Sequence, residues 1–105
     1  MNKTWQDITP QEVENKAVNQ IEVQLIDVRN PEEYAAGRIK GSMLIPLNEL
    51  PARVNEIDKD KEVICICRSG NRSGKACEYL SSLGYNNVKN MVGGMMEWKG
   101  NVEKD

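Results

Sequence analysis

The sequence predicts an α/β fold, in which an open, mostly parallel β-sheet is flanked by helices on both faces. Apolar runs of strand length, such as residues 23–28 and 63–66, alternate along the chain with segments that have helical spacing and helix-start signals. These runs are almost continuously apolar, which is typical of strands buried on both faces of a parallel sheet. The length of 105 residues fits a single domain that covers residues 1–105.

The N-terminal segment is expected to contain a short strand and a capped helix. Residues 5–8 form the expected strand. Thr9 as N-cap, Pro10 at the first helical position and Glu12 as partner in a capping box then mark the start of a helix. This helix is expected to run to about Asn19.

A second capped helix follows the apolar run at 23–28, which is expected to be a buried strand. Asn30, Pro31 and Glu33 repeat the N-cap, proline and capping-box signals. The short helix that they begin is expected to end at Gly37.

The other elements have weaker signals. A brief strand is expected at 43–45 and a final strand at 85–91. Apolar residues at helical spacing predict a helix over 50–57, and a helical turn or two is expected at 95–99. Residues 101–105 are expected to form a frayed tail.

The central stretch joins a strand, a loop and a helix. Residues 63–66 form the expected strand, and helical spacing begins at Ser73, with Gly84 as the C-terminal cap. Between strand and helix lies a loop that begins with a cysteine and ends with an arginine, formed by Cys67, Arg68, Ser69, Gly70, Asn71 and Arg72.

This loop has the features of an anion-binding site. A loop that turns into the start of a helix directs backbone N–H groups inward, and the helix dipole adds partial positive charge there. The pKa of Cys67 is expected to be lowered, because these N–H groups and nearby cations stabilise the thiolate. Arg68 and Arg72 supply the cations, and Gly70 gives the backbone the freedom that a tight ring needs. The sequence therefore predicts a nucleophilic thiolate in an anion-binding loop.

Residues 67–73 closely resemble the active-site loop of rhodanese-type sulfurtransferases. Residues 25–34 and 37–42 resemble the first signature of that family, and Gly93-Gly94 with residues 97–100 resembles its C-terminal signature. The matches cover most of the chain and follow the order of the family. The resemblance implies a single-domain, rhodanese-like sulfurtransferase with the rhodanese-like open sheet.

The resemblance implies sulfur transfer in two steps, with Cys67 as the catalytic residue. The thiolate attacks the outer sulfur of an anionic donor such as thiosulfate, and sulfite leaves. Cyanide, a thiol or a sulfur-accepting protein then takes the sulfur from the Cys67 persulfide. No metal and no organic cofactor is implied. The substrate-binding residues that it implies are Arg68, Ser69, Gly70, Asn71, Arg72 and Ser73.

Two positions depart from the family pattern. Arg38 stands where the family usually has histidine, and Ser42 stands where alanine is usual. Neither change is expected to affect the thiolate. The other two cysteines, Cys65 within the apolar strand and Cys77 on the helix, are expected to be core residues.

Several residues near the expected site are assigned structural roles. Asp27 and Arg29 are expected to form hydrogen bonds and an ion pair, and Gly93-Gly94 is expected to permit close backbone approach beside the loop. The large apolar residues of this region are expected to belong to the core or to a pocket wall, and they are Trp98, Met91, Met95 and Met96.

The composition excludes several classes of function. A formal net charge of -2 argues against nucleic acid or an anionic membrane as the main partner. The absence of histidine excludes Cys-His catalysis and histidine bases. Three cysteines without disulfide or zinc spacing, and no apolar leader or membrane-spanning run, predict a reducing compartment, most simply the cytoplasm.

Two alternative functions remain open from the sequence. Phosphatases and arsenate reductases also use a cysteine–arginine loop between a strand and a helix, with five residues between cysteine and arginine. Here four residues separate Cys67 from Arg72, and the smaller ring favours a sulfur centre over a tetrahedral oxyanion. The other alternative is a persulfide carrier or sulfur-delivery domain, because a carrier and an enzyme share the same persulfide.

Overall fold

The computed structural model describes residues 4–19 and 22–105 of the chain. Its strands are β1 (Gln6–Ile8), β2 (Val23–Asp27), β3 (Met43–Leu44), β4 (Glu62–Ile66) and β5 (Val88–Met91). Within the described residues they form a five-stranded sheet in the order β1-β5-β4-β2-β3, and each pair of neighbours is parallel. The predicted parallel sheet is confirmed.

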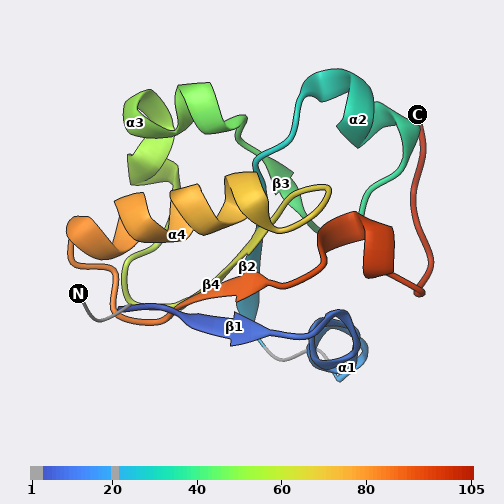
Figure 1. The fold of residues 1–105 in the computed structure, drawn as a ribbon, viewed down its shortest axis with the longest axis horizontal. Coiled ribbons are helices and arrows are strands. Elements are labelled where there is room, and N and C mark those ends of the chain that lie inside the picture. The colour runs from blue at the N-terminus through green and yellow to red at the C-terminus, as the bar shows by residue number, and fades with distance from the viewer. Residues whose placement is uncertain (1–3, 20–21) are drawn as a thin grey trace.

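Helices connect the strands and cover both faces of the sheet. They are α1 (Pro10–Val18), α2 (Pro31–Ala36), α3 (Leu50–Arg53), α4 (Asn71–Ser82) and three short 3-10 turns, Leu47–Glu49, Val54–Glu56 and η3 (Gly94–Glu97). In Figure 1, α3 and α4 lie on one face of the sheet and α1 lies on the opposite face. No helix in the described part of the chain is long and apolar enough to cross a membrane.

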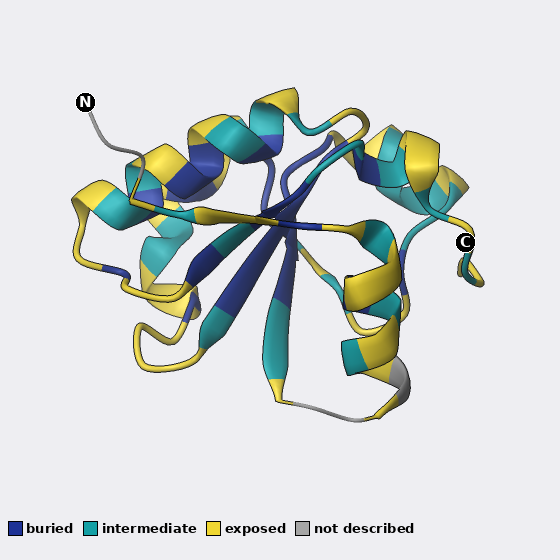
Figure 2. Cartoon of the chain, turned by 60° about the horizontal axis from the view of Figure 1, so that its bottom comes forward, coloured by how far each residue is buried: buried dark blue, intermediate teal, exposed yellow. Residues whose placement is uncertain are grey.

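Successive side chains of the central strands pack into two separate cores. Ile26 and Cys65 pack with Leu80 on the face covered by α4, whereas Ile64 packs with Val13 on the face covered by α1. Figure 2 shows the strands as the buried centre of the molecule, with exposed residues on the outer surfaces of the helices. This burial on both faces explains why the strand sequences are continuously apolar.

The predicted helix caps form hydrogen bonds in the structure. The hydroxyl of Thr9 accepts the Glu12 backbone N–H at 3.1 Å, and the Glu12 carboxylate accepts the Thr9 backbone N–H at 3.1 Å. At α2, the Glu33 carboxylate accepts the backbone N–H of Asn30 at 3.0 Å. Local capping therefore fixes where both helices begin.

The predicted helix over 50–57 and the predicted strand over 85–91 are both shorter in the structure. The α-helical part ends at Arg53, and a 3-10 turn follows. The last strand begins at Val88, because the side chain of Tyr85 forms hydrogen bonds outside the sheet. Its buried hydroxyl donates to the backbone carbonyls of Val54 and Ile57, at 3.0 and 2.9 Å, and thereby ties this segment to the end of the α3 region.

The expected frayed tail is wrong, because residues near the C-terminus bind α2 and the segment after it. Arg38 and Glu103 exchange two backbone hydrogen bonds of 2.9 Å, and the Asp105 backbone N–H donates to the Ala35 carbonyl at 3.0 Å. The Arg38 guanidinium also pairs with the Asp105 carboxylate at 2.7 Å and lies 4.7 Å from the centre of the Tyr34 ring. Figure 1 shows the C-terminus beside α2.

Candidate active site

The cysteine predicted to be the nucleophile lies at the carboxyl end of the central strand. Cys67 directly follows β4, and its residue is fully buried (0% exposed). Its Sγ accepts the backbone N–H of Gly70 at 3.0 Å and lies 3.2 Å from the Ser73 hydroxyl oxygen. In Figure 1 the loop between β4 and α4 lies between α2 and η3, at the edge of the sheet where open α/β proteins bind ligands.

The surroundings of the Cys67 sulfur determine its acidity. Burial on its own raises the pKa of this thiol, because it disfavours the charged thiolate. Hydrogen bonds with the Ser73 hydroxyl and from the backbone N–H groups of Ser73, Gly70 and Ser69 act in the opposite direction and are together stronger. The pKa of Cys67 is therefore lowered, as the sequence predicts, by a mechanism that needs no histidine.

The loop is two residues shorter than expected, because α4 begins at Asn71 and not at Ser73. Gly70 is the N-cap residue and adopts a left-handed conformation with φ of 100°, which favours glycine. Ser69 and Asn71 are exposed. Ser69 thus contributes its backbone N–H to the sulfur, and Asn71 lies outside the ring at the start of the helix.

The loop rests on the turn that follows β5. The backbone N–H groups of Met95 and Met96 donate to the carbonyls of Cys67 and Arg68, at 2.9 and 3.0 Å. A Cβ atom at Gly94 would lie only 2.4 Å from the Arg68 carbonyl oxygen, and Gly94 also has a positive φ of 59°. The expectation that this glycine pair permits close backbone approach is confirmed.

A buried hydrogen-bond network extends from the sulfur to β5. Ser73 donates its hydroxyl hydrogen to Asn90 Oδ1 at 2.6 Å, and Asn90 Nδ2 donates to the Gly70 carbonyl at 3.1 Å. Asn90 is 8% exposed, and sequence reasoning missed it. The available signal was a carboxamide between Val88 and Met91, inside a strand whose ends are apolar.

Arg72 has a different partner from the one expected. Its guanidinium forms two hydrogen bonds to the Glu33 carboxylate of α2, at 2.8 and 2.9 Å, whereas the resemblance implied that it binds substrate. The reason is the early start of α4, which places Arg72 on the first helical turn beside α2. The bond to Glu33 is the main reason why the pKa of Arg72 is raised, with a smaller contribution from the charge of Cys67.

Arg68 is exposed, and its side chain forms no hydrogen bond or ion pair within the described residues. It lines a cleft of about 330 Å³ beside the loop, together with Arg29, Glu33, Met95 and Met96. The charge of Arg29 is balanced by Asp27, which accepts two bonds of 2.8 and 2.9 Å from the guanidinium in a buried pair. Arg68 is therefore the cation in this cleft that has no carboxylate partner.

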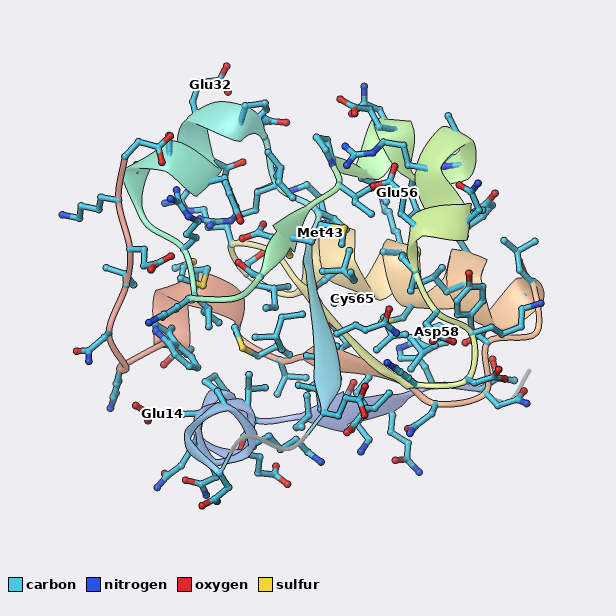
Figure 3. The ribbon with its side chains drawn as sticks, turned by 180° about the vertical axis from the view of Figure 1, so that it is seen from behind. Glu14, Glu32, Met43, Glu56, Asp58 and Cys65 are labelled. Carbon is cyan, nitrogen blue, oxygen red and sulfur yellow. The ribbon has the colours of Figure 1, made fainter. Side chains whose placement is uncertain are left out.

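The remaining residues near the site divide between the core and the rim. Cys65 and Cys77 are buried in the core beneath α4, as expected, and Figure 3 shows Cys65 within the sheet. Met91 is also fully buried, whereas Met96 is 65% exposed and lines the cleft, so it belongs to the pocket wall and not to the core. Among the described residues, no three His, Cys, Asp or Glu side chains are grouped so that they could hold a metal ion.

A buried thiol at the carboxyl end of a central parallel strand, surrounded by loop N–H groups and a helix N-terminus, defines a protein with a cysteine-based anion loop. Comparison with known proteins identifies the family. The profile of the rhodanese-like domain matches residues 9–101. The chain belongs to the rhodanese-like family, as its motifs indicate.

Similar proteins include named sulfurtransferases. A sulfurtransferase of Allochromatium vinosum is 38% identical over 92 residues, which are 88% of this chain and 86% of that protein. The thiosulfate sulfurtransferase GlpE of Pseudomonas aeruginosa is 30% identical over 99 residues, with 94% and 88% covered. The crystal structure of a rhodanese-like domain protein from Staphylococcus aureus has a TM-score of 0.87 at 36% identity and covers 95% of this chain and 98% of that one.

Proposed function

We propose that this protein transfers sulfane sulfur from a small anionic donor such as thiosulfate to cyanide, a thiol or a sulfur-accepting protein, through a persulfide on Cys67. The observation that supports this most strongly is the setting of the Cys67 sulfur. It accepts the Gly70 N–H at 3.0 Å and has a lowered pKa, and the next residue in the loop is Arg68, whose side chain forms no ion pair within the described residues. A thiolate in such a site is the nucleophile that covalent sulfur transfer requires.

In the first step, the Cys67 thiolate attacks the outer sulfur of thiosulfate. A bond forms between Sγ and this sulfur, the sulfur–sulfur bond of the donor breaks, and its electron pair leaves with sulfite. The backbone N–H groups around Sγ, including that of Gly70, remain available to the persulfide. Arg68 on the rim reduces the cost of bringing a dianion to the loop.

In the second step, an acceptor nucleophile attacks the outer sulfur of the persulfide. The bond from that sulfur to Sγ breaks, and its electron pair returns to Cys67 as the thiolate. The loop N–H groups and the Ser73 hydroxyl then stabilise the regenerated charge. Over the whole cycle, the acceptor supplies one electron pair and sulfite leaves with one electron pair. The reaction therefore needs no further oxidant or reductant.

Phosphate chemistry fits the site less well. A phosphatase of this kind needs an arginine that faces the oxyanion, whereas Arg72 makes both of its short hydrogen bonds to Glu33. The ring is also small, with α4 beginning four residues after Cys67. A persulfide carrier uses the same thiolate, and it differs from the enzyme only in lacking turnover with small acceptors.

Turnover with thiosulfate and cyanide, followed as thiocyanate, tests this function. We expect activity in the wild type and none in Cys67→Ser. Cys77→Ser is the matched control, because Cys77 is a buried cysteine of α4 that the reaction does not use, and we expect it to retain activity. Full activity in Cys67→Ser would overturn the proposal, and a stoichiometric persulfide without turnover would favour the carrier.

We also propose that residues 1–105 act as one domain and that the protein works in a reducing compartment such as the cytoplasm. The support is chemical. Cys67, Cys65 and Cys77 are all free, and sulfur transfer needs Cys67 as a thiolate rather than in a disulfide.

A further inference from the structure

We propose that Asn90 is a positioning residue for Cys67, which acts by competing with the sulfur for the single hydrogen of the Ser73 hydroxyl. This inference deepens the proposed function, on which its meaning for turnover rests. Asn90 lies on β5, 23 positions after Cys67 in the sequence, and its side chain bonds to Ser73 and to the Gly70 carbonyl. The proposed effect reaches the sulfur through Ser73 and not through the bond that Asn90 donates to the Gly70 carbonyl.

The four groups involved form a closed circuit of hydrogen bonds. Gly70 N–H donates to Cys67 Sγ at 3.0 Å, and Sγ lies 3.2 Å from Ser73 Oγ. Ser73 donates to Asn90 Oδ1 at 2.6 Å, and Asn90 Nδ2 donates back to the Gly70 carbonyl at 3.1 Å. Ser73 is fully buried and Asn90 nearly so, so water does not replace any of these partners freely.

Counting hydrogens shows which state of the cysteine the circuit suits. A hydroxyl has one hydrogen to donate, and here that hydrogen is directed to Asn90. The bond between Cys67 and Ser73 then requires the sulfur to be the donor, which it can be only as a thiol. Every donor in the circuit is satisfied when Cys67 is protonated.

When Cys67 ionises, its thiolate and Asn90 Oδ1 compete for the single hydrogen of the Ser73 hydroxyl. The thiolate gains most if the Ser73 hydroxyl turns towards it, since a hydrogen bond to a charged acceptor is stronger than a neutral one. That rotation leaves Asn90 Oδ1 buried, without its donor and 2.6 Å from an oxygen lone pair. Asn90 cannot turn its amide to relieve the contact without giving up the Gly70 carbonyl.

The consequence for sulfur transfer follows from the change in charge at Sγ. The thiolate carries the charge on Sγ before attack, whereas in the persulfide Sγ is divalent and the charge lies on the outer sulfur. Ser73 can then donate to Asn90 again, so Asn90 stabilises the persulfide relative to the free thiolate. By this action Asn90 limits how far the loop lowers the pKa of Cys67. A thiolate of higher basicity is a better nucleophile.

A double-mutant cycle at Ser73 and Asn90 tests this proposal without any sulfur donor. The measured quantity is the pH midpoint of iodoacetamide alkylation at Cys67, located by peptide mass spectrometry and checked by thiolate absorbance. The variants replace only Ser73 and Asn90, so they leave in place every other charged or titratable side chain around the loop. These side chains are Arg29, Asp27, Glu33, Cys65, Arg68, Arg72 and Cys77.

We expect Asn90→Ala to lower the midpoint by about one pH unit, because Ser73 then donates to the thiolate without a competitor. We expect Ser73→Ala to raise the midpoint, because it removes the donor. Adding Asn90→Ala to the Ser73→Ala background should change nothing further. Asn90→Leu, which fills the space of the carboxamide, is the second variant in case Asn90→Ala does not fold.

The cycle separates the two contacts that Asn90 makes. An effect through the Gly70 carbonyl would be the same with and without Ser73, whereas competition for the Ser73 hydrogen disappears when Ser73 is absent. A midpoint that rises equally in both backgrounds, or does not move in either, would overturn the proposal. Because alkylation needs no donor or acceptor, a protein that failed to transfer sulfur would still give a decisive result here.

Discussion

Arg29 and Arg68 line the cleft beside the loop, Arg72 lies at the start of α4, and the partners of these three arginines give them different roles. Arg29 is neutralised by Asp27 in a buried pair, and Arg72 is bound to Glu33 through two hydrogen bonds. Arg68 forms no ion pair within the described residues. At the residue scale, we therefore propose Arg68 as the group that binds an anionic donor, whereas Arg72 joins α4 to α2.

Replacing Arg68 should weaken donor binding with little effect on stability. We expect Arg68→Ala to raise the KM for thiosulfate about tenfold with a small change in kcat, because a rim charge contributes to ground-state binding. Arg68→Lys should restore part of the loss, since it restores the charge. Steady-state kinetics and thermal melting measure both effects, and a fall in kcat at constant KM would contradict this role.

The pair of Arg72 and Glu33 should give the protein a pH-dependent stability. Hydrogen bonds from Arg72 lower the pKa of Glu33 from 4.5 to about 2. A carboxyl group with a lowered folded-state pKa stabilises the fold above its unfolded pKa, and this contribution is lost as the pH falls from about 4.5 to about 2.

Arg72→Ala should therefore lower the free energy of unfolding by about 1 kcal/mol near pH 7. The expected loss is small because solvent screens this partly exposed ion pair. The difference from wild type should shrink on acidification through the range named above. Urea denaturation at the two ends of that range measures it, with Glu33→Gln as the matched variant. A difference that does not depend on pH would show that the ion pair is not its source.

At the scale of elements, the active loop is held from one side by the start of α4 and from the other by the turn after β5. Gly70 caps α4 in a left-handed conformation, and Gly94 lets η3 approach the loop carbonyls of Cys67 and Arg68. The N–H groups that point at the sulfur depend on this backbone packing. Loop geometry and thiolate stability should therefore fail together when the packing is disturbed.

Gly94→Ala tests the close approach at the loop. Both Gly94 and Gly41 have a positive φ, but a Cβ atom at Gly41 would meet nothing within 4 Å. Gly41→Ala should cost about 1 kcal/mol for the backbone conformation alone, whereas Gly94→Ala should cost about 3 kcal/mol and raise the alkylation midpoint of Cys67. Equal losses of stability in urea denaturation would mean that the approach to the Arg68 carbonyl is not what requires glycine.

Arg38 should hold the C-terminal residues against α2. We expect Arg38→Ala to speed hydrogen exchange at the backbone N–H groups of Glu103 and Asp105, because the side chain binds the Asp105 carboxylate and lies close to that of Glu103. Arg53→Ala is the control, as Arg53 pairs with Glu49 and Glu56 instead. Unchanged exchange in Arg38→Ala would show that the backbone bonds suffice.

At the scale of the whole molecule, the sheet order places the Cys67 loop between two supporting elements. β4 lies between β2 and β5, so α2 follows one neighbour and η3 follows the other. Loop, α2 and η3 thereby meet at the carboxyl edge of the sheet, as Figure 1 shows. The cleft, the ion pair to α2 and the hydrogen bonds to η3 all result from this order.

Features fixed by local sequence could be predicted, and features fixed by distant contacts could not. The strands, the caps at Thr9 and Asn30 and the loop at Cys67 depend on neighbours in the sequence, and their existence was predicted. The bond from Arg72 to Glu33 joins residues 39 positions apart, and the bond from Ser73 to Asn90 joins residues 17 apart. No pattern in a single sequence specifies such pairs.

The C-terminal residues illustrate the same limit. Their charges and their position at the end of the chain suggested fraying, but the structure pairs them with Arg38, which stands where the family pattern usually has histidine. The departure from the family pattern was visible in the sequence. Its partner was visible only in the fold.

Intact-protein mass spectrometry after incubation with thiosulfate tests the central claim most directly. We expect the wild type to gain the mass of one sulfur atom, peptide mapping to place that sulfur on Cys67, and cyanide to remove it. Cys67→Ser should gain nothing, while Cys77→Ser should behave as wild type. Sulfur on Cys65 or Cys77, or no gain of mass in a folded wild-type protein, would contradict the persulfide on Cys67.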